Sequence, residues 1–295
     1  MHVQIETING VCSARCPMCT IETWTRKINT MSLEELRVIL EKFVPYREKI
    51  RFLTLHGFAE PLLDREMPVK VRLAKDLGFQ GVGFASNATH LDAGMARELL
   101  EAGLDTIICS IDGIKKETHE AIRPRTDFAK VVSQVEHFIA LRDAGDYRTR
   151  VMIRFIHQKL NREEWPEYLA YWTARIDPAR RDEVVKFEIH NWGDKIENYE
   201  NSDLHEDLPI DGLVCSDVFE RMFIYSDGSV ALCCADDNGF YDHGNVLKED
   251  PIRIYNNPVF TRYRKVMLDG RILSLDHCEN CTIPRSRGLK AVPAS

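Results

Sequence analysis

Three cysteines near the amino terminus, Cys12, Cys16 and Cys19, have the type and spacing to hold a metal centre. Thiolates are ligands for zinc and for iron–sulfur clusters, and intervals of three and two residues place all three on one short loop. A closed zinc site takes four protein ligands, so a set of three leaves a coordination position open. The triplet alone is also compatible with a zinc knuckle or with three buried thiols that bind no metal.

The segments that must position this loop alternate between strand and helix patterns. Apolar, β-branched runs predict strands at 3–8, 51–56, 80–85, 106–110, 151–156 and 184–189. Helical periodicity lies between them at 33–43, 65–77, 92–102 and 128–142. Capping boxes are expected at Ser32 and at Asn161, each beginning a helix. The alternation predicts βαβ crossovers and a parallel α/β sheet, two units short of a closed eight-unit barrel.

Polar motifs follow successive strands, and the chemistry of a parallel barrel collects at the carboxyl ends of its strands. They are Gly57, Glu60 and Pro61 after the second strand, Ser86 and Asn87 after the third, and Ser110 and Asp112 after the fourth. Each motif alone is also what a turn contains, because Asn, Asp and Gly are turn residues. Their joint order after the cysteine triplet favours one shared site.

Four further side chains are candidates for substrate contact or catalysis. Arg154 interrupts an apolar strand and either extends towards solvent or points into the barrel, where it would hold a carboxylate or a hydroxyl-rich substrate. His190 follows the sixth strand, in a segment that fits substrate contact and a capped turn almost equally. Arg123 and Arg125 form a second pair of substrate candidates.

The carboxyl-terminal third carries a second group of thiols after a polar segment that predicts a linker from about residue 198. Cys215 and Cys233 flank an Asp-Gly centre between alternating runs, which predicts a hairpin that brings them together. Cys278 and Cys281 form a C-x₂-C pair. Four thiols make a closed site, and zinc fits this spacing as well as an iron–sulfur cluster does.

Two cysteines are left over from these groups. Cys234 adjoins Cys233, so either of the two could ligate the metal. The one left over is expected to be a buried small residue, which is the commonest fate of a free cysteine. Cys109 lies inside the fourth strand and is expected in the core.

Composition narrows the class of protein. The chain has 295 residues and a formal charge of −7, which argues against a nucleic-acid binder because such a protein needs a basic surface. No apolar run approaches the length of a membrane span, and no secretory signal is visible at the amino terminus. Without such a signal we expect a cytoplasmic protein with reduced thiols, where clustered cysteines more often bind metal than form disulfides.

The triplet after the first strand, with the strand-end motifs in this order, resembles the radical S-adenosylmethionine (SAM) superfamily. The resemblance implies a partial (β/α)₆ TIM barrel in which Cys12, Cys16 and Cys19 hold a 4Fe–4S cluster whose fourth iron binds SAM. It implies SAM contacts from the strand-end residues: Gly57, Glu60, Pro61, Ser86, Asn87, Ser110 and Asp112. Phe58 and Ala59 depart from the family's Gly-Gly-Glu-Pro segment, so Glu60 and Pro61 align well and Gly57 only loosely.

The later cysteines resemble the Twitch domain, a shortened SPASM domain that binds one auxiliary 4Fe–4S cluster. The resemblance implies that Cys215, Cys233, Cys278 and Cys281 are its ligands. It divides the chain into a barrel at 1–200 and a small α+β Twitch domain at 201–295. It also implies an external one-electron reductant, such as a flavodoxin.

The resemblance implies radical chemistry on a sugar or aminocyclitol, in which a hydrogen atom is removed from a hydroxyl-bearing carbon and the auxiliary cluster completes an oxidation. Arg154 or His190 would accept the proton or orient the hydroxyl. One alternative is an epimerase in which Cys234 returns a hydrogen atom. Another is an enzyme that modifies a ribosomally made peptide, and a third, of a different class, is a zinc-binding module without enzymatic activity.

Overall fold

The computed structural model describes residues 1–193, 195–196, 210–241 and 243–290. The predicted linker from about residue 198 lies outside these residues. The boundary expected between residues 200 and 201 lies outside them too, so the division into two domains stays a prediction.

Six parallel strands form the sheet of the amino-terminal two thirds. They are β1 (His2–Ile5), β2 (Phe52–Thr54), β3 (Val82–Ser86), β4 (Thr106–Ser110), β5 (Arg150–His157) and β6 (Glu183–Glu188). Each strand pairs in parallel with the next one along the chain, as expected for a series of crossover connections. The predicted α/β architecture of a partial barrel is therefore confirmed.

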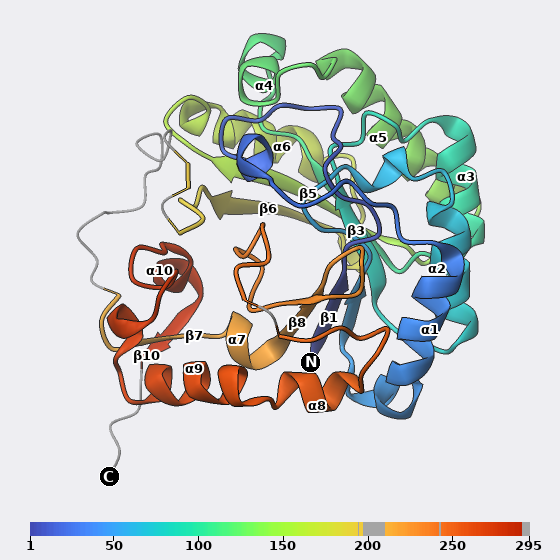
Figure 1. Ribbon diagram of the computed structural model, residues 1–295. Coiled ribbons are helices and arrows are strands. Elements are labelled where there is room, and N and C mark those ends of the chain that lie inside the picture. The colour runs from blue at the N-terminus through green and yellow to red at the C-terminus, as the bar shows by residue number, and fades with distance from the viewer. Residues whose placement is uncertain (194, 197–209, 242, 291–295) are drawn as a thin grey trace.

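Helices between the strands cover the outer side of this curved sheet (Figure 1). They are α1 (Leu33–Phe43), α2 (Met67–Asp76), α3 (Ala93–Glu101), α4 (Lys116–Ile122), α5 (Phe128–Ala144) and α6 (Trp165–Thr173). Short 3₁₀ turns lie at Thr20–Thr23, Val44–Lys49, Pro61–Leu63, Arg162–Glu164, Pro178–Arg180 and Ile272–Ser274. The short helix α4 was not predicted from the sequence.

One of the two predicted helix caps forms. The Ser32 hydroxyl accepts a hydrogen bond from the Glu35 N–H, and the Glu35 carboxylate accepts one from the Ser32 N–H, which makes a capping box. The capping box predicted at Asn161 is wrong. The Asn161 side chain instead accepts the Gln158 N–H and donates to the carbonyls of Asp112 and Ile156, so it ties together the segments that follow β4 and β5.

The carboxyl-terminal third adds two strands to the same sheet. Its elements are β7 (Leu213–Cys215), α7 (Asp217–Glu220), β8 (Arg221–Ile224), β9 (Val230–Ala231), α8 (Pro251–Tyr255), α9 (Pro258–Leu268), α10 (Ile283–Arg287) and β10 (Gly288–Lys290). The predicted hairpin is present as the antiparallel pair β8–β9. Strand β8 also pairs in parallel with β1, which the sequence did not predict, and β7 pairs with β10.

The two faces of the sheet differ in polarity. Val151, Ile153 and Phe155 are fully buried on β5, and Phe155 packs against Trp165 and Tyr168 at α6. Cys109 is buried in this core, as expected. Residues that alternate with these face the inside of the barrel, among them Arg154, whose guanidinium donates to the Ser110 hydroxyl at 2.5 Å.

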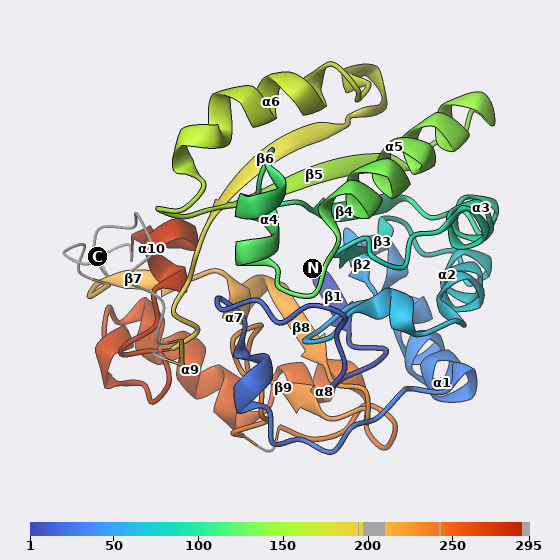
Figure 2. The same cartoon turned by 90° about the horizontal axis from the view of Figure 1, so that it is seen from above.

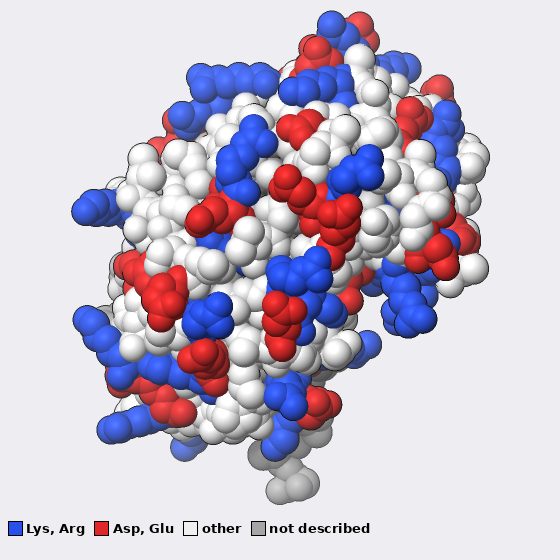
Figure 3. Space-filling view, turned by 90° about the vertical axis from the view of Figure 1, so that its right-hand side faces the viewer, with Lys and Arg blue, Asp and Glu red and all other residues white. Residues whose placement is uncertain are grey.

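The surface mixes charges of both signs. On the face that Figure 3 presents, which is the right-hand side of Figure 1, basic and acidic side chains lie close to one another with no large area of one sign. Within the described residues, no helix is long and apolar enough to cross a membrane.

A buried ion pair fixes the start of β5 against α5 and predicts a measurable loss of stability. The Asp182 carboxylate accepts hydrogen bonds from Arg142 at 2.7 and 2.8 Å and from the Val151 N–H at 2.7 Å. Removing one partner of a buried pair costs about 3–5 kcal/mol, so we expect Asp182→Ala to lower the free energy of unfolding by that amount in urea denaturation.

The matched control is Asp143→Ala. Asp143 also pairs with Arg142, at 2.8 Å, but 45% of its side chain is exposed, so its loss should cost about 1 kcal/mol or less. Equal effects of the two substitutions would contradict a structural role for the buried pair.

Candidate functional site

The loop that carries Cys12, Cys16 and Cys19 lies across the carboxyl ends of the barrel strands. Three segments fasten it there. The Glu60 N–H donates to the Val11 carbonyl at 3.1 Å, and the Arg15 N–H donates to the Pro124 carbonyl at 3.2 Å. The indole N–H of Trp192 donates to the Met18 carbonyl at 3.1 Å. The loop is therefore positioned by residues that follow β2, α4 and β6.

The three thiols form one group in a poorly solvated place. Burial raises the pKa of Cys12 to about 11 and that of Cys19 to about 12, and it raises the pKa of Cys16. The Cys19 N–H donates to the Cys16 carbonyl at 2.9 Å, which keeps these two cysteines on one tight turn. Among the described residues, no three His, Cys, Asp or Glu side chains gather closely enough to hold a single metal ion.

Glu60, Ser86 and Asn87 meet beside Cys12. The buried Glu60 carboxylate accepts the Ser86 hydroxyl at 2.7 Å and the N–H groups of Asn87 at 2.8 Å and Leu62 at 3.1 Å. Burial raises the pKa of Glu60, and these hydrogen bonds oppose that rise. The Asn87 amide donates towards Cys12 Sγ at 3.7 Å. The structure thus brings the expected SAM contacts after β2 and β3 into one hydrogen-bonded group.

Gly57 is required by the close approach of Glu6. A Cβ at residue 57 would lie 2.6 Å from the Glu6 side chain. Glu6 cannot move aside freely, because the Arg26 guanidinium holds both of its carboxylate oxygens at 2.8 Å. The same carboxylate accepts the N–H groups of Phe58 and Ser226. Glu6 therefore joins the candidate SAM segment, the chain after the cysteines and the turn between β8 and β9. Pro61 begins the 3₁₀ turn that follows Glu60.

The candidates after β4 form a second group. Ser110 accepts from Arg154, as described above. Asp112 is fully buried and pairs with Arg123 at 2.7 Å, and Arg123 reaches to 3.7 Å from Cys16 Sγ. Arg125 is exposed and has a left-handed backbone conformation. The two arginines, which we predicted from the sequence to be a pair of substrate contacts, therefore differ in the structure: Arg123 is buried and Arg125 is exposed.

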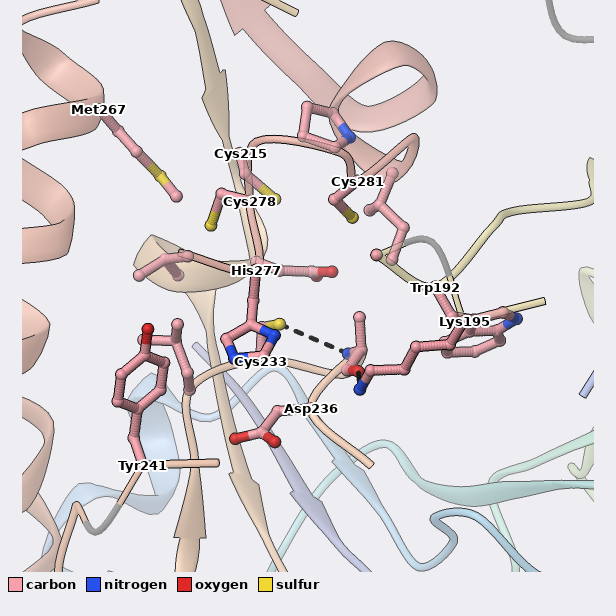
Figure 4. Close-up of a pocket in the computed structure, with 17 residues that line it drawn as sticks. Trp192, Lys195, Cys215, Cys233, Asp236, Tyr241, Met267, His277, Cys278 and Cys281 are labelled. Carbon is pink, nitrogen blue, oxygen red and sulfur yellow. Dashed lines mark hydrogen bonds between the residues drawn. The ribbon is translucent and has the colours of Figure 1, made fainter. Parts of the chain in front are cut away.

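Cys215, Cys233, Cys278 and Cys281 line one cavity of about 40 Å³ in the carboxyl-terminal third (Figure 4). They come from the end of β7, from the segment after β9 and from the segment before α10. Burial raises the pKa of all four thiols, and the neighbouring thiols, Cys234 first among them, raise the pKa of Cys233 further. Four thiols can supply one ligand to each iron of a 4Fe–4S cluster, so no carboxylate or imidazole ligand is needed.

Cys234 is oriented differently from Cys233. The Cys233 side chain lines the cavity and accepts the Ala235 N–H at 3.4 Å (Figure 4). The Cys234 thiol does not line the cavity and donates to Asp217 Oδ2 at 3.0 Å. The adjacent cysteines are therefore distinct in their surroundings, and Cys233 is the one placed with the other three.

The segment after β6 connects the two thiol groups. His190 is half-buried there. The Asn191 amide bonds to the backbone of Thr282 and of Asn280, next to Cys281. Trp192 lines the second cavity while its indole reaches Met18 of the first loop. Trp192 also has a φ of +54°, which is unusual for a bulky residue and marks a constrained position.

Sequence reasoning missed three residues that the structure places at these sites. Glu6 and Asp217 lie in segments whose pattern gave no signal of function. His56 ends the strand pattern directly before Gly57, so its position was a usable signal. Burial, reinforced by Arg154, lowers the pKa of His56 to about 3, which keeps its imidazole neutral at physiological pH.

Comparison with known proteins gives a family match for the segment that contains each group of thiols. The model of the radical SAM superfamily matches residues 7–170, and the model of the SPASM iron–sulfur cluster-binding domain matches residues 215–282. Curated relatives include GTP 3′,8-cyclase of Marinobacter nauticus, 29% identical over 56% of this chain and 48% of that protein. Another is 7,8-dihydro-6-hydroxymethylpterin dimethyltransferase of Methanocaldococcus jannaschii, 30% identical over 39% of this chain and 23% of that protein. The chain spans about half or less of the length of these relatives.

Solved structures share the fold over most of the chain. BtrN in complex with AdoMet and 2-DOIA has a TM-score of 0.65 at 18% identity, covering 95% of this chain and 92% of that one. Streptococcus suis SuiB bound to precursor peptide SuiA has a TM-score of 0.70 at 11% identity, covering 96% and 69%. Identities this low establish the fold alone.

The radical SAM match covers more than half of the chain, and the SPASM match covers the segment that contains the second thiol group. This result replaces the interpretation of the chain as a zinc-binding module. The cofactors are those of the family, SAM and iron–sulfur clusters. The chain belongs to the radical SAM superfamily and carries a carboxyl-terminal SPASM domain.

Proposed function

We propose that this enzyme is a dehydrogenase that oxidises a hydroxyl-bearing carbon of a small polyhydroxylated substrate, such as a sugar or an aminocyclitol. The observation that carries the proposal is the complete set of four thiols around the second cavity. A cluster with four protein ligands has no open iron for binding substrate, so it is suited to accepting an electron.

The residues of the first loop would hold the cluster that binds SAM. Cys12, Cys16 and Cys19 supply three ligands and leave one iron for SAM. A cluster held there would supply, when reduced, the electron needed to cleave SAM to methionine and a 5′-deoxyadenosyl radical, and that radical would remove a hydrogen atom from the substrate. The group of Glu60, Ser86 and Asn87 lies beside Cys12 and would orient the amino end of SAM.

The inner face of the barrel supports a polar substrate. A closed barrel fills this space with apolar side chains. Here Arg154 and Ser110 face it from β5 and β4, and the neutral His56 lies near Arg154 at the end of β2. These donors and acceptors suit hydroxyl groups. Oxidation of an alcohol after loss of a hydrogen atom also releases the hydroxyl proton. His190 is the candidate acceptor of that proton, and Arg154 would orient the hydroxyl, because a guanidinium only donates. Burial lowers the pKa of His56 to about 3, so His56 would orient a hydroxyl and would be too weakly basic to take its proton.

A second candidate function, epimerisation, is favoured by one contact. The Cys234 thiol donates to Asp217 Oδ2 at 3.0 Å, so it carries a hydrogen atom. Once that atom is given to a substrate, one electron from the second cluster and one proton from solvent would restore the thiol. A thiol of this kind could donate a hydrogen atom to a substrate radical. The product would then be a stereoisomer with no net oxidation.

Product mass distinguishes the two reactions. We expect anaerobic turnover in deuterated water of a panel of aminocyclitols and sugars, beginning with 2-DOIA, to give a product lighter by two hydrogens. Mass spectrometry should also show that Cys234→Ala keeps most of this activity. A product that gains one deuterium without oxidation, and that disappears in Cys234→Ala, would support epimerisation instead. A panel in which no compound increases 5′-deoxyadenosine formation would contradict a small polyol substrate.

Iron content tests which adjacent cysteine is the ligand. After anaerobic reconstitution we expect Cys233→Ala to retain about half of the wild-type iron, because the second of two 4Fe–4S clusters is lost. Cys234→Ala is the matched control and should retain nearly all of it. The reverse pattern would assign Cys234 as the ligand and would remove it as a hydrogen-atom donor.

A further inference from the structure

Arg123 lies directly against one of the thiols of the first loop. Its guanidinium donates towards Cys16 Sγ at 3.7 Å, and only 9% of its side chain is exposed. The neighbouring Pro124 carbonyl accepts the Arg15 N–H at 3.2 Å. The chain after α4 therefore contacts the cysteine loop at two independent points, one through backbone atoms and one through a positive charge.

Asp112 lies behind Arg123 and carries the opposite charge. Its Oδ2 is 2.7 Å from Arg123 Nε, its Oδ1 accepts the Ile156 N–H at 2.7 Å, and its side chain is fully buried. The charges of both residues act on Cys16, in opposite directions, and Arg154 adds a further positive charge nearby. Water screens these charges little, because all of them are buried or partly buried.

We propose that Arg123 and Asp112 set the reduction potential of the first cluster from outside its ligands, with Arg123 raising the potential and Asp112 lowering it. Reduction adds one negative charge to the cluster. A cation that donates to a ligand sulfur stabilises that charge, whereas a carboxylate nearby opposes it. Arg123 thus makes entry of the electron easier. The inference rests on the proposed ligand role of Cys16 and is independent of the substrate.

The burial of Arg123 also changes how this residue is interpreted. As a substrate contact it would have to present its guanidinium to the barrel interior. Its guanidinium instead pairs with the Asp112 carboxylate and donates towards Cys16 Sγ. Arg123 is therefore a positioning and charge-setting residue, and its removal should change a property of the cluster that can be measured without substrate.

The test is a redox titration of the protein with both clusters bound, in the absence of SAM and substrate. The reduced fraction of each cluster is measured by electron paramagnetic resonance. The signal of the first cluster is identified in parallel samples by its change when SAM is added. We expect Arg123→Gln to shift its potential to more negative values and Asp112→Asn to shift it to more positive values. Arg125→Gln removes an exposed charge two residues away and should leave the potential unchanged. The second cluster serves as an internal reference.

Two further variants cover the case in which Arg123→Gln fails to fold with Asp112 unpaired. Arg123→Lys keeps the charge and should give a smaller shift, and the double variant Arg123→Gln/Asp112→Asn should lie between the two single variants. The inference is overturned if Asp112→Asn does not raise the potential, or if iron-replete Arg123 variants shift no further than Arg125→Gln. Opposite shifts in a protein that oxidises no alcohol would contradict the proposed dehydrogenase and leave this inference standing.

Discussion

Three half-buried thiols on one short loop are the constraint on which the rest of this structure depends. A loop with these side chains is unfavourable by itself, because burial disfavours the charged thiolates that a metal requires. The barrel meets this requirement by fastening the loop through backbone bonds at Val11 and Arg15 and through the Trp192 indole at Met18. The loop can then hold its shape while one coordination position stays available.

The carboxyl-terminal third is joined to the barrel at the same place. Strand β8 pairs with β1, which leads directly into the cysteine loop. Glu6, at the end of β1, binds Arg26, the Phe58 N–H and the Ser226 N–H, so one buried carboxylate connects the candidate SAM segment with the β8–β9 turn. In Figure 2 the dark-blue cysteine segment runs between α4 and the carboxyl-terminal elements, as the bonds from Arg15 to Pro124 and from Thr25 to Asn238 require. These contacts join the cysteine loop directly to the carboxyl-terminal third.

The sequence predicted much of this arrangement because its signals were local. Alternation of strand and helix patterns gave the parallel sheet, and the Asp-Gly centre gave the β8–β9 hairpin. The capping box predicted at Asn161 does not form, because the Asn161 amide donates instead to the carbonyls of Asp112 and Ile156, and Asp112 is distant in sequence. The pairing of β8 with β1 joins residues more than two hundred positions apart, and no local pattern encodes it. The burial of Arg123 and the roles of Glu6 and Asp217 likewise depend on contacts distant in sequence.

The first cluster should keep one iron open for SAM, whereas the second should have a protein ligand on every iron, and the most direct measurement addresses that difference. Electron–nuclear double resonance of the reduced protein, with SAM labelled by ¹⁵N in its amino group and ¹⁷O in its carboxylate, reports direct binding to iron. The account predicts couplings on the signal of the cluster held by Cys12, Cys16 and Cys19, and none on that of the cluster held by Cys215, Cys233, Cys278 and Cys281. Couplings on the second signal, or on neither, would contradict it.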